Sequence, residues 1–261
     1  QKHIVKESLR SFELSGVALD GAKSSRFKEI KEQLSLLSNQ FSKNVLQATN
    51  SWKKVVSENA LKGFSESELS KVRSGDNYEI NLQVPIYIDL MTYADNRELR
   101  EEVYKAYISR ASDVGITSKE FDNRKIMDEI LELRSELSQL LGFSNYAQYS
   151  VESKMVDSPE AVIDFLEKLI ELSLPQARSE LNELQSFAGH ELMPWDLMYY
   201  SEKLKQKKFN FKSSDLKPYF PEESVFNGLF NTIQKLYGIE LNIVDEVTYH
   251  SDVREIGRAS C

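Results

Sequence analysis

The sequence has 261 residues and a formal net charge of −8, and 41% of its residues are hydrophobic and 10% aromatic. This composition can bury a substantial core, which excludes a disordered chain, and the acidic balance excludes a nucleic-acid binder with a basic face. No run of about 18 apolar residues occurs, so we expect no membrane-spanning helix and no membrane partner. The only cysteine is Cys261, which excludes an internal disulfide and favours a reducing, cytoplasmic compartment.

Helical periodicity dominates the N-terminal part of the chain. A short helix is predicted over Ile4–Leu14, ended by Gly16, and the longest helix over Ser24–Val56. In the long helix, apolar residues recur every three or four positions, which is typical of a helix that packs along another helix. This stripe consists of Phe27, Ile30, Leu34, Leu37, Phe41, Val45, Ala48 and Trp52. We therefore expect antiparallel helix pairing in this part of the fold.

A β-strand is predicted after these helices. Ser65 and Glu68 have the spacing of a capping box, which indicates the start of a short helix, and residues 74–77 form a turn. Apolar and polar residues then alternate over Tyr78–Val84, as in a half-buried strand, and Pro85 stops it. Because one strand is not stable alone, we expect a partner either near Leu241–Val247 or outside this chain.

Further helices are predicted in the middle of the chain. Asp95 is expected to cap a helix that runs to about Ser112, and Asp122 or Asn123 to open the next one. Gly142 is expected to end that helix in a left-handed conformation, with Phe143 folded back over its last turn.

The C-terminal half continues the helical pattern. Residues 145–154 are predicted to form a short helix, and Asp157–Glu160 combine an N-cap, a proline and an acid, which indicates a strong helix start. Pro175 lies inside that helix and is expected to kink or split it. A last helix over Ser224–Tyr237 and a strand over Ile239–Val247 follow. The predicted class is mainly α with one or two short β-strands: residues 1–255 form the helical part, and residues 256–261 are interpreted as a vector-derived or frameshifted tail.

The segment Pro194–Lys203 differs from the rest of the chain because it combines Trp195, a tyrosine pair, an acid and a lysine. Pro194 fits the first position of a helix, and the side chains that follow at three- and four-residue spacing share one face. These candidate site residues are Asp196, Tyr199, Tyr200 and Lys203. Two interpretations stay open: a short helix with aromatic core residues and polar ends at its rim, or the wall of a substrate channel.

The residues alone indicate no catalytic or metal site. His190-Glu191 begins the metallopeptidase pattern His-Glu-x-x-His, but Pro194 occupies the position of the second histidine. Proline offers no ligand and breaks the helix that the motif requires, so we expect His190 to lie in a polar loop. No Gly-x-Ser-x-Gly element and no glycine-rich phosphate loop occur either. We therefore predict no catalytic residue and no metal ligand in this chain.

Ordered sequence blocks nevertheless resemble the thimet oligopeptidase family of zinc metallopeptidases over nearly the whole chain, to about Arg254. No single block is decisive, and it is their order that makes the likeness specific. The blocks include Phe12–Val17, Gln40–Leu46, Met91–Asn96, Leu99–Glu102, Tyr107–Ser112, Glu129–Arg134, Leu140–Ala147, Pro194–Asp196, Tyr199–Lys203, Tyr219–Pro221, Asn227–Phe230 and Tyr237–Ile239.

The resemblance implies a two-lobed, mostly helical cytosolic endopeptidase that hydrolyses short peptides. In this family a zinc held by two histidines and a further glutamate activates a water molecule, with the motif glutamate as general base. The chain departs from the family pattern because it is expected to start after the N-terminal segment and to stop before the His-Glu-x-x-His region. No zinc ligand or general base can therefore be carried over onto any residue here.

Two functions follow as expectations. In the first, the chain is a fragment of a zinc oligopeptidase, and the fragment alone binds no zinc and is inactive. The surface that truncation exposes on this fragment is expected to promote self-association. The alternative is a stand-alone helical binding or scaffold module without enzymatic activity. The ordered blocks favour the first.

Overall fold

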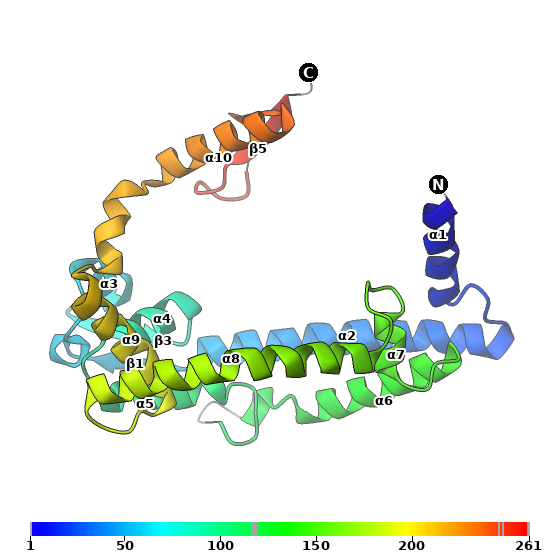
Figure 1. Cartoon of the computed structure of the whole chain (residues 1–261), viewed down its shortest axis with the longest axis horizontal. Coiled ribbons are helices and arrows are strands. Elements are labelled where there is room, and N and C mark those ends of the chain that lie inside the picture. Colours follow the sequence, from blue (N-terminus) through cyan, green and yellow to red (C-terminus); the bar gives the residue numbers. More distant parts are fainter. Residues whose placement is uncertain (1, 116–118, 245, 247, 260–261) are drawn as a thin grey trace. The chain divides into compact units, whose positions relative to one another are not determined.

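The structure of this chain is a computed structural model that describes residues 2–115, 119–244, 246 and 248–259. Helices dominate these residues and the strands are short (Figure 1), which confirms the predicted mainly α class. The chain divides into two compact units, residues 1–204 and 205–261.

The first unit contains most of the helices. Its α-helices are α1 (Lys2–Leu14), α2 (Gly21–Ser51), α3 (Glu66–Val72), α4 (Val84–Tyr93), α5 (Arg97–Ile108), α6 (Arg124–Leu140), α7 (Tyr146–Val151), α8 (Pro159–Ala188) and the start of α9 (Pro194–Phe209). Short 3-10 turns lie at Glu58–Leu61 and Lys119–Phe121. Helix α4 was not predicted, although Pro85 fits its first turn.

Helices α2 and α6 form an antiparallel pair, as the apolar stripe of α2 predicted. Arg26 near the start of α2 hydrogen-bonds Glu136 near the end of α6, with both distances 2.7 Å. At the other end, the buried Asn44 donates to Asn123 at 2.8 Å, and Asn123 donates to the Phe41 carbonyl at 3.2 Å. These contacts fix both the direction and the register of the pair.

The C-terminal end of the long helix was predicted wrongly. Helix α2 ends at Ser51, and Lys53–Val56 form strand β1 instead of a further helical turn. Trp52 between them has an extended backbone with φ −91° and ψ 124°. The β-branched residues Val55 and Val56 fit a pleated, half-buried sheet surface, and pairing with a neighbouring strand makes this segment a strand instead of a helical turn.

Strand β1 pairs with β3 (Asn77–Asn81), which was predicted as a strand, and β3 also pairs with β2 (Arg73–Ser74) through the predicted turn. The sheet is antiparallel with the order β1-β3-β2, and Lys53 lies opposite Asn81. The expectation of a partner near Leu241–Val247 or outside the chain is therefore wrong. The actual partner, β1, was not predicted because the apolar spacing of Lys53–Val56 also fits a helix.

The hydrophobic core of the first unit surrounds this sheet. Buried residues of the sheet, α3, α4 and α5 meet there, and Trp195 of α9 joins them. The largest fully buried apolar members are Leu61, Ile80, Leu82, Leu90, Met91 and Val103. Gly63 is required beside this core because its φ is +103° and an added Cβ would lie 2.1 Å from the Tyr93 carbonyl oxygen.

Several helix ends confirm the local predictions. Ser65 and Glu68 form the capping box that starts α3. Gly142 has φ +85°, and the Phe143 N–H donates to the Ser138 carbonyl at 2.9 Å, so the chain folds back after α6 as expected. The cap of α5 differs, because Asn96 and not Asp95 accepts the Leu99 N–H, at 3.1 Å.

Helix α8 begins as predicted, with the Ser158 hydroxyl accepting the Ala161 N–H at 3.1 Å. It then continues through Pro175 as one helix (Figure 1), so of the two predicted effects of this proline the split is wrong and the kink stays a prediction. The proline removes one backbone hydrogen bond, but long helical segments on both sides maintain the helix. Gly189, with φ +76°, ends it.

The second unit contains the end of α9, a 3-10 turn at Ser213–Tyr219, α10 (Glu222–Tyr237), β4 (Glu240–Val244) and β5 (Glu255–Ala259). Strands β4 and β5 are antiparallel, with Asn242 opposite Gly257. The described residues 256–259 of the expected tail thus lie within strand β5, and residues 260 and 261 lie outside the described part. The foreign origin of that tail stays a prediction.

Candidate functional site

The residues predicted around Pro194 meet α5 in what we call the Asp196 cluster, formed by Asp95, Arg97, Arg100, Asp196, Tyr199 and Lys203. Asp196 lies in the first turn of α9, where its carboxylate accepts the Met193 N–H at 3.1 Å. This contact is half of a capping box and ties the carboxylate to the start of its own helix. The side chain is fully buried.

Two arginines of α5 neutralise the Asp196 carboxylate. Arg97 donates from Nε and Nη2 at 3.0 and 2.7 Å to the two carboxylate oxygens, and Arg100 donates from Nη2 at 2.9 Å. Burial alone would raise the pKa of Asp196, but the hydrogen bonds from Arg97, the Met193 N–H and Arg100 outweigh it and lower this pKa. A carboxylate held in this way is a poor general base, so the geometry indicates an anchor.

Arg100 is as buried as its partner, with 1% of its surface exposed. Its remaining donors reach the Ala94 carbonyl at 2.7 Å and the Trp195 carbonyl at 3.1 Å. Its guanidinium also lies 4.1 Å from the centroid of the Tyr199 ring, a cation–π contact. Arginine suits this position because its planar guanidinium can donate to the Asp196 carboxylate and to both carbonyls at the same time.

Asp95 links the cluster to the next turn of α9. Its carboxylate accepts the Tyr199 hydroxyl at 2.8 Å and lies 3.4 Å from Lys203 Nζ. Burial, followed by the hydrogen bond to Asp95, raises the pKa of Tyr199 to about 12. Asp95 therefore holds α9, which explains why it does not cap α5.

The Tyr200 ring packs edge-to-face against Tyr199 of the cluster, with 5.1 Å between ring centroids, but its hydroxyl is directed to another part of the chain. Its hydroxyl is 3.0 Å from His190 Nε2, and the other ring nitrogen of His190 is 2.7 Å from the Glu191 carbonyl. A carbonyl only accepts, so Nδ1 carries the proton and, in the neutral ring, Nε2 accepts the Tyr200 hydroxyl. His190 is exposed in the loop between α8 and α9, as predicted.

Three of the four candidate residues, Asp196, Tyr199 and Lys203, thus share one cluster, whereas Tyr200 contacts the α8–α9 loop. Sequence reasoning did not find Arg97 and Arg100, which precede Asp196 by almost one hundred residues. Their spacing of three on a helix was a signal that both guanidinium groups share a face. Nothing in the local sequence indicated which carboxylate they would hold.

The described residues do not fit a zinc ion. They contain no group of three or more His, Cys, Asp or Glu side chains that could hold a metal. Both ring nitrogens of His190 are engaged, and His250 Nδ1 accepts the Asp252 N–H at 3.2 Å. The side chain of His3 lies outside the described part. No step of a reaction can therefore be assigned to a metal held by these residues.

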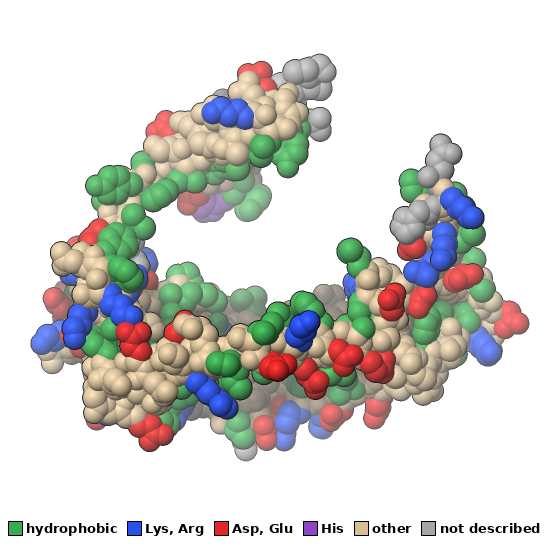
Figure 2. Space-filling view, in the orientation of Figure 1, with side chains coloured by type: hydrophobic (Ala, Val, Ile, Leu, Met, Phe, Trp, Pro, Cys, Tyr) green, Lys and Arg blue, Asp and Glu red, His purple; other side chains and the backbone are tan. Residues whose placement is uncertain are grey.

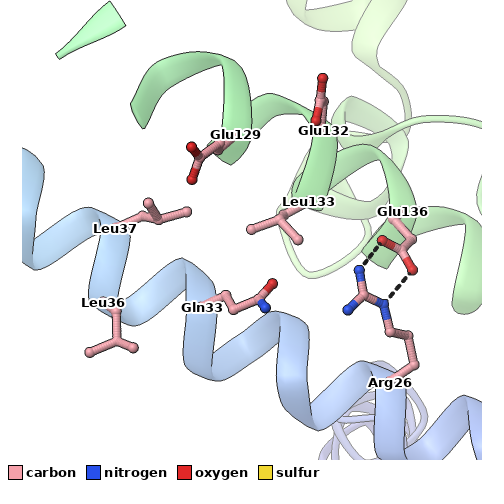
Figure 3. Close-up of a pocket in the computed structure, with 8 residues that line it drawn as sticks. All are labelled: Arg26, Gln33, Leu36, Leu37, Glu129, Glu132, Leu133 and Glu136. Carbon is pink, nitrogen blue, oxygen red and sulfur yellow. Dashed lines mark hydrogen bonds and ion pairs between the residues drawn. The ribbon is translucent and has the colours of Figure 1, made fainter. Parts of the chain in front are cut away.

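A groove of about 410 Å³ lies between α2 and α6. In Figure 3, Arg26 is joined to Glu136, Glu129 and Leu133 are directed toward α2, and Leu36 is directed away from α6. The hydrogen bond from Arg26 lowers the pKa of Glu136. Gln33, Leu37 and Glu132 complete the lining, which holds no nucleophile beside a base. The groove is a feature of the helix pair and shows no catalytic arrangement.

Comparison with known proteins identifies the class of the chain. The model of peptidase family M3 matches residues 90–257. Oligopeptidase A of Escherichia coli strain K12 is 45% identical over 97% of this chain and 39% of the relative. The probable cytosolic oligopeptidase A of Arabidopsis thaliana is 36% identical over 97% of the chain and 39% of the relative. Dipeptidyl carboxypeptidase of Escherichia coli strain K12 is 30% identical over 93% of the chain and 37% of the relative.

These relatives are peptidases, and the family match covers more than half of the residues. The chain belongs to peptidase family M3. It spans about two-fifths of the length of the curated relatives it matches. Among the described residues, no helix has both the length and the apolarity needed to cross a membrane.

Proposed function

We propose that this chain is a non-catalytic part of a zinc-dependent oligopeptidase that cleaves short peptides in the cytoplasm. The observation that carries the proposal is the match over 97% of the chain to oligopeptidase A, combined with described residues that provide no metal ligands. Zinc, the general base and the cleavage step then belong to another part of the peptidase. Alone, the chain binds no zinc and cleaves no peptide.

Within such a peptidase, the Asp196 cluster positions α9. Asp196 has no exposed surface, so its role is to hold the helix, whereas Tyr199, Tyr200 and Lys203 are half-buried and keep some surface for contact with a peptide. Asp95, in the loop that precedes α5, orients Tyr199 and Lys203. This arrangement supports a channel-wall role for α9 in which α5 supplies the rigid backing.

A swap experiment tests the proposal. The matched 39% of Escherichia coli oligopeptidase A is replaced by this chain, and cleavage of a short fluorogenic peptide is compared for the chimera and for the chain alone. We expect chelator-sensitive cleavage by the chimera and none by the chain, with no stoichiometric zinc in the purified chain. Cleavage by the chain alone that a chelator abolishes would overturn the proposal.

A further inference from the structure

Helix α8 carries an apolar surface that the described residues of the first unit leave exposed. Every residue from 163 to 183 is exposed, although the helix is fixed near its C-terminal end by the buried Leu184. Figure 2 shows hydrophobic side chains on the surface along this helix. The exposed large residues are Ile163, Phe165, Leu166, Leu169, Ile170, Leu172, Leu174 and Leu181.

The apolar face of α8, defined by these eight residues, is too wide for a helix at a protein surface. At 100° per residue, the eight side chains cover an arc of about 200°, whereas a surface helix typically needs an apolar arc of about 100°. The exposed fractions range from 40% for Leu174 to 68% for Leu172. An arc of this width is typical of a helix that is buried on two sides.

The size of the face matches a stable interface. With about 150 Å² for each residue, the lower limit of the range for aromatic side chains, the exposed fractions of the eight residues together give on the order of 600 Å². A stable protein–protein interface buries about 800 Å² on each partner. The face therefore approaches the area that one partner buries in a stable interface.

The charge of α8 favours a protein partner over a membrane or a second copy. The helix contains six acidic and two basic residues, so its formal charge is −4. Helices that lie on membranes have a polar face rich in lysine and arginine, whereas α8 has only Lys168 and Arg178 among its eight charged residues. Two copies of α8 would bring two acidic helices together, which like-charge repulsion disfavours.

The comparisons indicate where the partner comes from. The relatives match almost the whole chain but carry about three-fifths of their length outside the match. In the second unit, none of the residues from 205 onward whose burial is described is buried, so these residues form no core among themselves. We propose that the apolar face of α8 is a docking surface for the part of a family M3 peptidase that lies outside the region matched by this chain.

Hydrogen exchange tests this proposal, which rests on the proposed place of the chain in a longer peptidase. The exchange of the α8 backbone amides is measured in the chain alone and in the chimera described above, with the amides of α5 as an internal reference. We expect α8 amides to exchange at least tenfold more slowly in the chimera and α5 amides to stay protected in both. The measurement needs no peptide cleavage, so a failed peptidase assay leaves it interpretable.

Substitutions locate the surface. Ile170→Glu combined with Leu174→Glu leaves the circular dichroism of the chain alone unchanged, because both side chains are exposed, but removes the protection of α8 in the chimera. Met155→Glu is the matched control: Met155 is fully exposed outside α8, and protection persists in that variant. Equal α8 exchange in chain and chimera would overturn the proposal, and so would α8 protection that rises with the concentration of the chain alone.

Discussion

The substitution Asp196→Asn tests the anchor role of the Asp196 cluster. It keeps the shape of the side chain but removes its charge, and it leaves the guanidinium of Arg100, which is 1% exposed, without a counter-ion. Breaking one partner of a buried ion pair costs about 3–5 kcal/mol. We expect the free energy of unfolding of the first unit to fall by about 3 kcal/mol or more at pH 7.

Urea denaturation followed by tryptophan fluorescence measures this loss, because Trp195 is part of the core of the first unit and Trp52 packs against that core. Asp113→Asn is the matched control. Asp113 pairs with Arg124 at 2.8 Å, but both side chains are exposed, and exposed pairs contribute about 0–1 kcal/mol. A loss below about 1 kcal/mol in Asp196→Asn would refute the assignment of this cluster as an anchor.

The same variant has a defined pH dependence. The pKa of Asp196 in the folded chain lies below its ordinary value of 3.8. The unfolded chain therefore takes up a proton first, so the stabilisation is present above pH 3.8 and is lost as the pH falls through the lower folded pKa. The stability difference between wild type and Asp196→Asn should shrink below pH 4, and a constant difference would contradict this reasoning.

Three further predictions concern other contacts. Gly63→Ala should lower stability by at least about 2 kcal/mol, and Gly75→Ala, which meets nothing within 4 Å at φ +58°, by about 1 kcal/mol in the same denaturation assay. Asn123→Ala should cost about 1–3 kcal/mol because it removes the acceptor of the buried Asn44 Nδ2 donor, and a double-mutant cycle with Asn44→Ala should show coupling. Tyr199→Phe should remove a phenol that titrates near pH 12, as measured by ultraviolet absorbance. Because the pKa of Tyr199 is higher in the folded chain than in the unfolded chain, the wild type should lose stability between pH 10 and 12 more steeply than the variant. A wild-type titration that shows no phenol near pH 12 would contradict the raised pKa of Tyr199.

Local signals in the sequence were sufficient where the structure is itself local. The capping box at Ser65, the fold-back at Gly142 and the cap at Ser158 each involve residues within a few positions, and each was predicted. Strand β1 was missed because Lys53–Val56 continues a helical apolar spacing, and only pairing with β3 makes it a strand. A helical stripe and a strand of four residues cannot be distinguished without the partner.

The candidate site shows the same limit. The face of α9 was predicted from spacing, but the buried pair of Arg100 and Asp196 joins residues 96 positions apart. Asp95 and Asn96 are both common helix caps, and the competition was decided by Tyr199 and Lys203, which engage Asp95 from α9. Propensity ranks such residues equally, so tertiary contacts determine which one caps the helix.

The direct passage from α2 into β1 has a mechanical consequence. The 31 residues of α2 extend for about 46 Å at 1.5 Å per residue, and a single residue, Trp52, joins the helix to the sheet. A rotation of about 5° at Trp52 would displace the far end of α2 by roughly 4 Å over that length. Because Arg26 and Asn44 bind α6 at both ends of the pair, α6 would follow the same movement. Helices α2 and α6 would therefore move together as one rigid body about Trp52, which packs against the hydrophobic core.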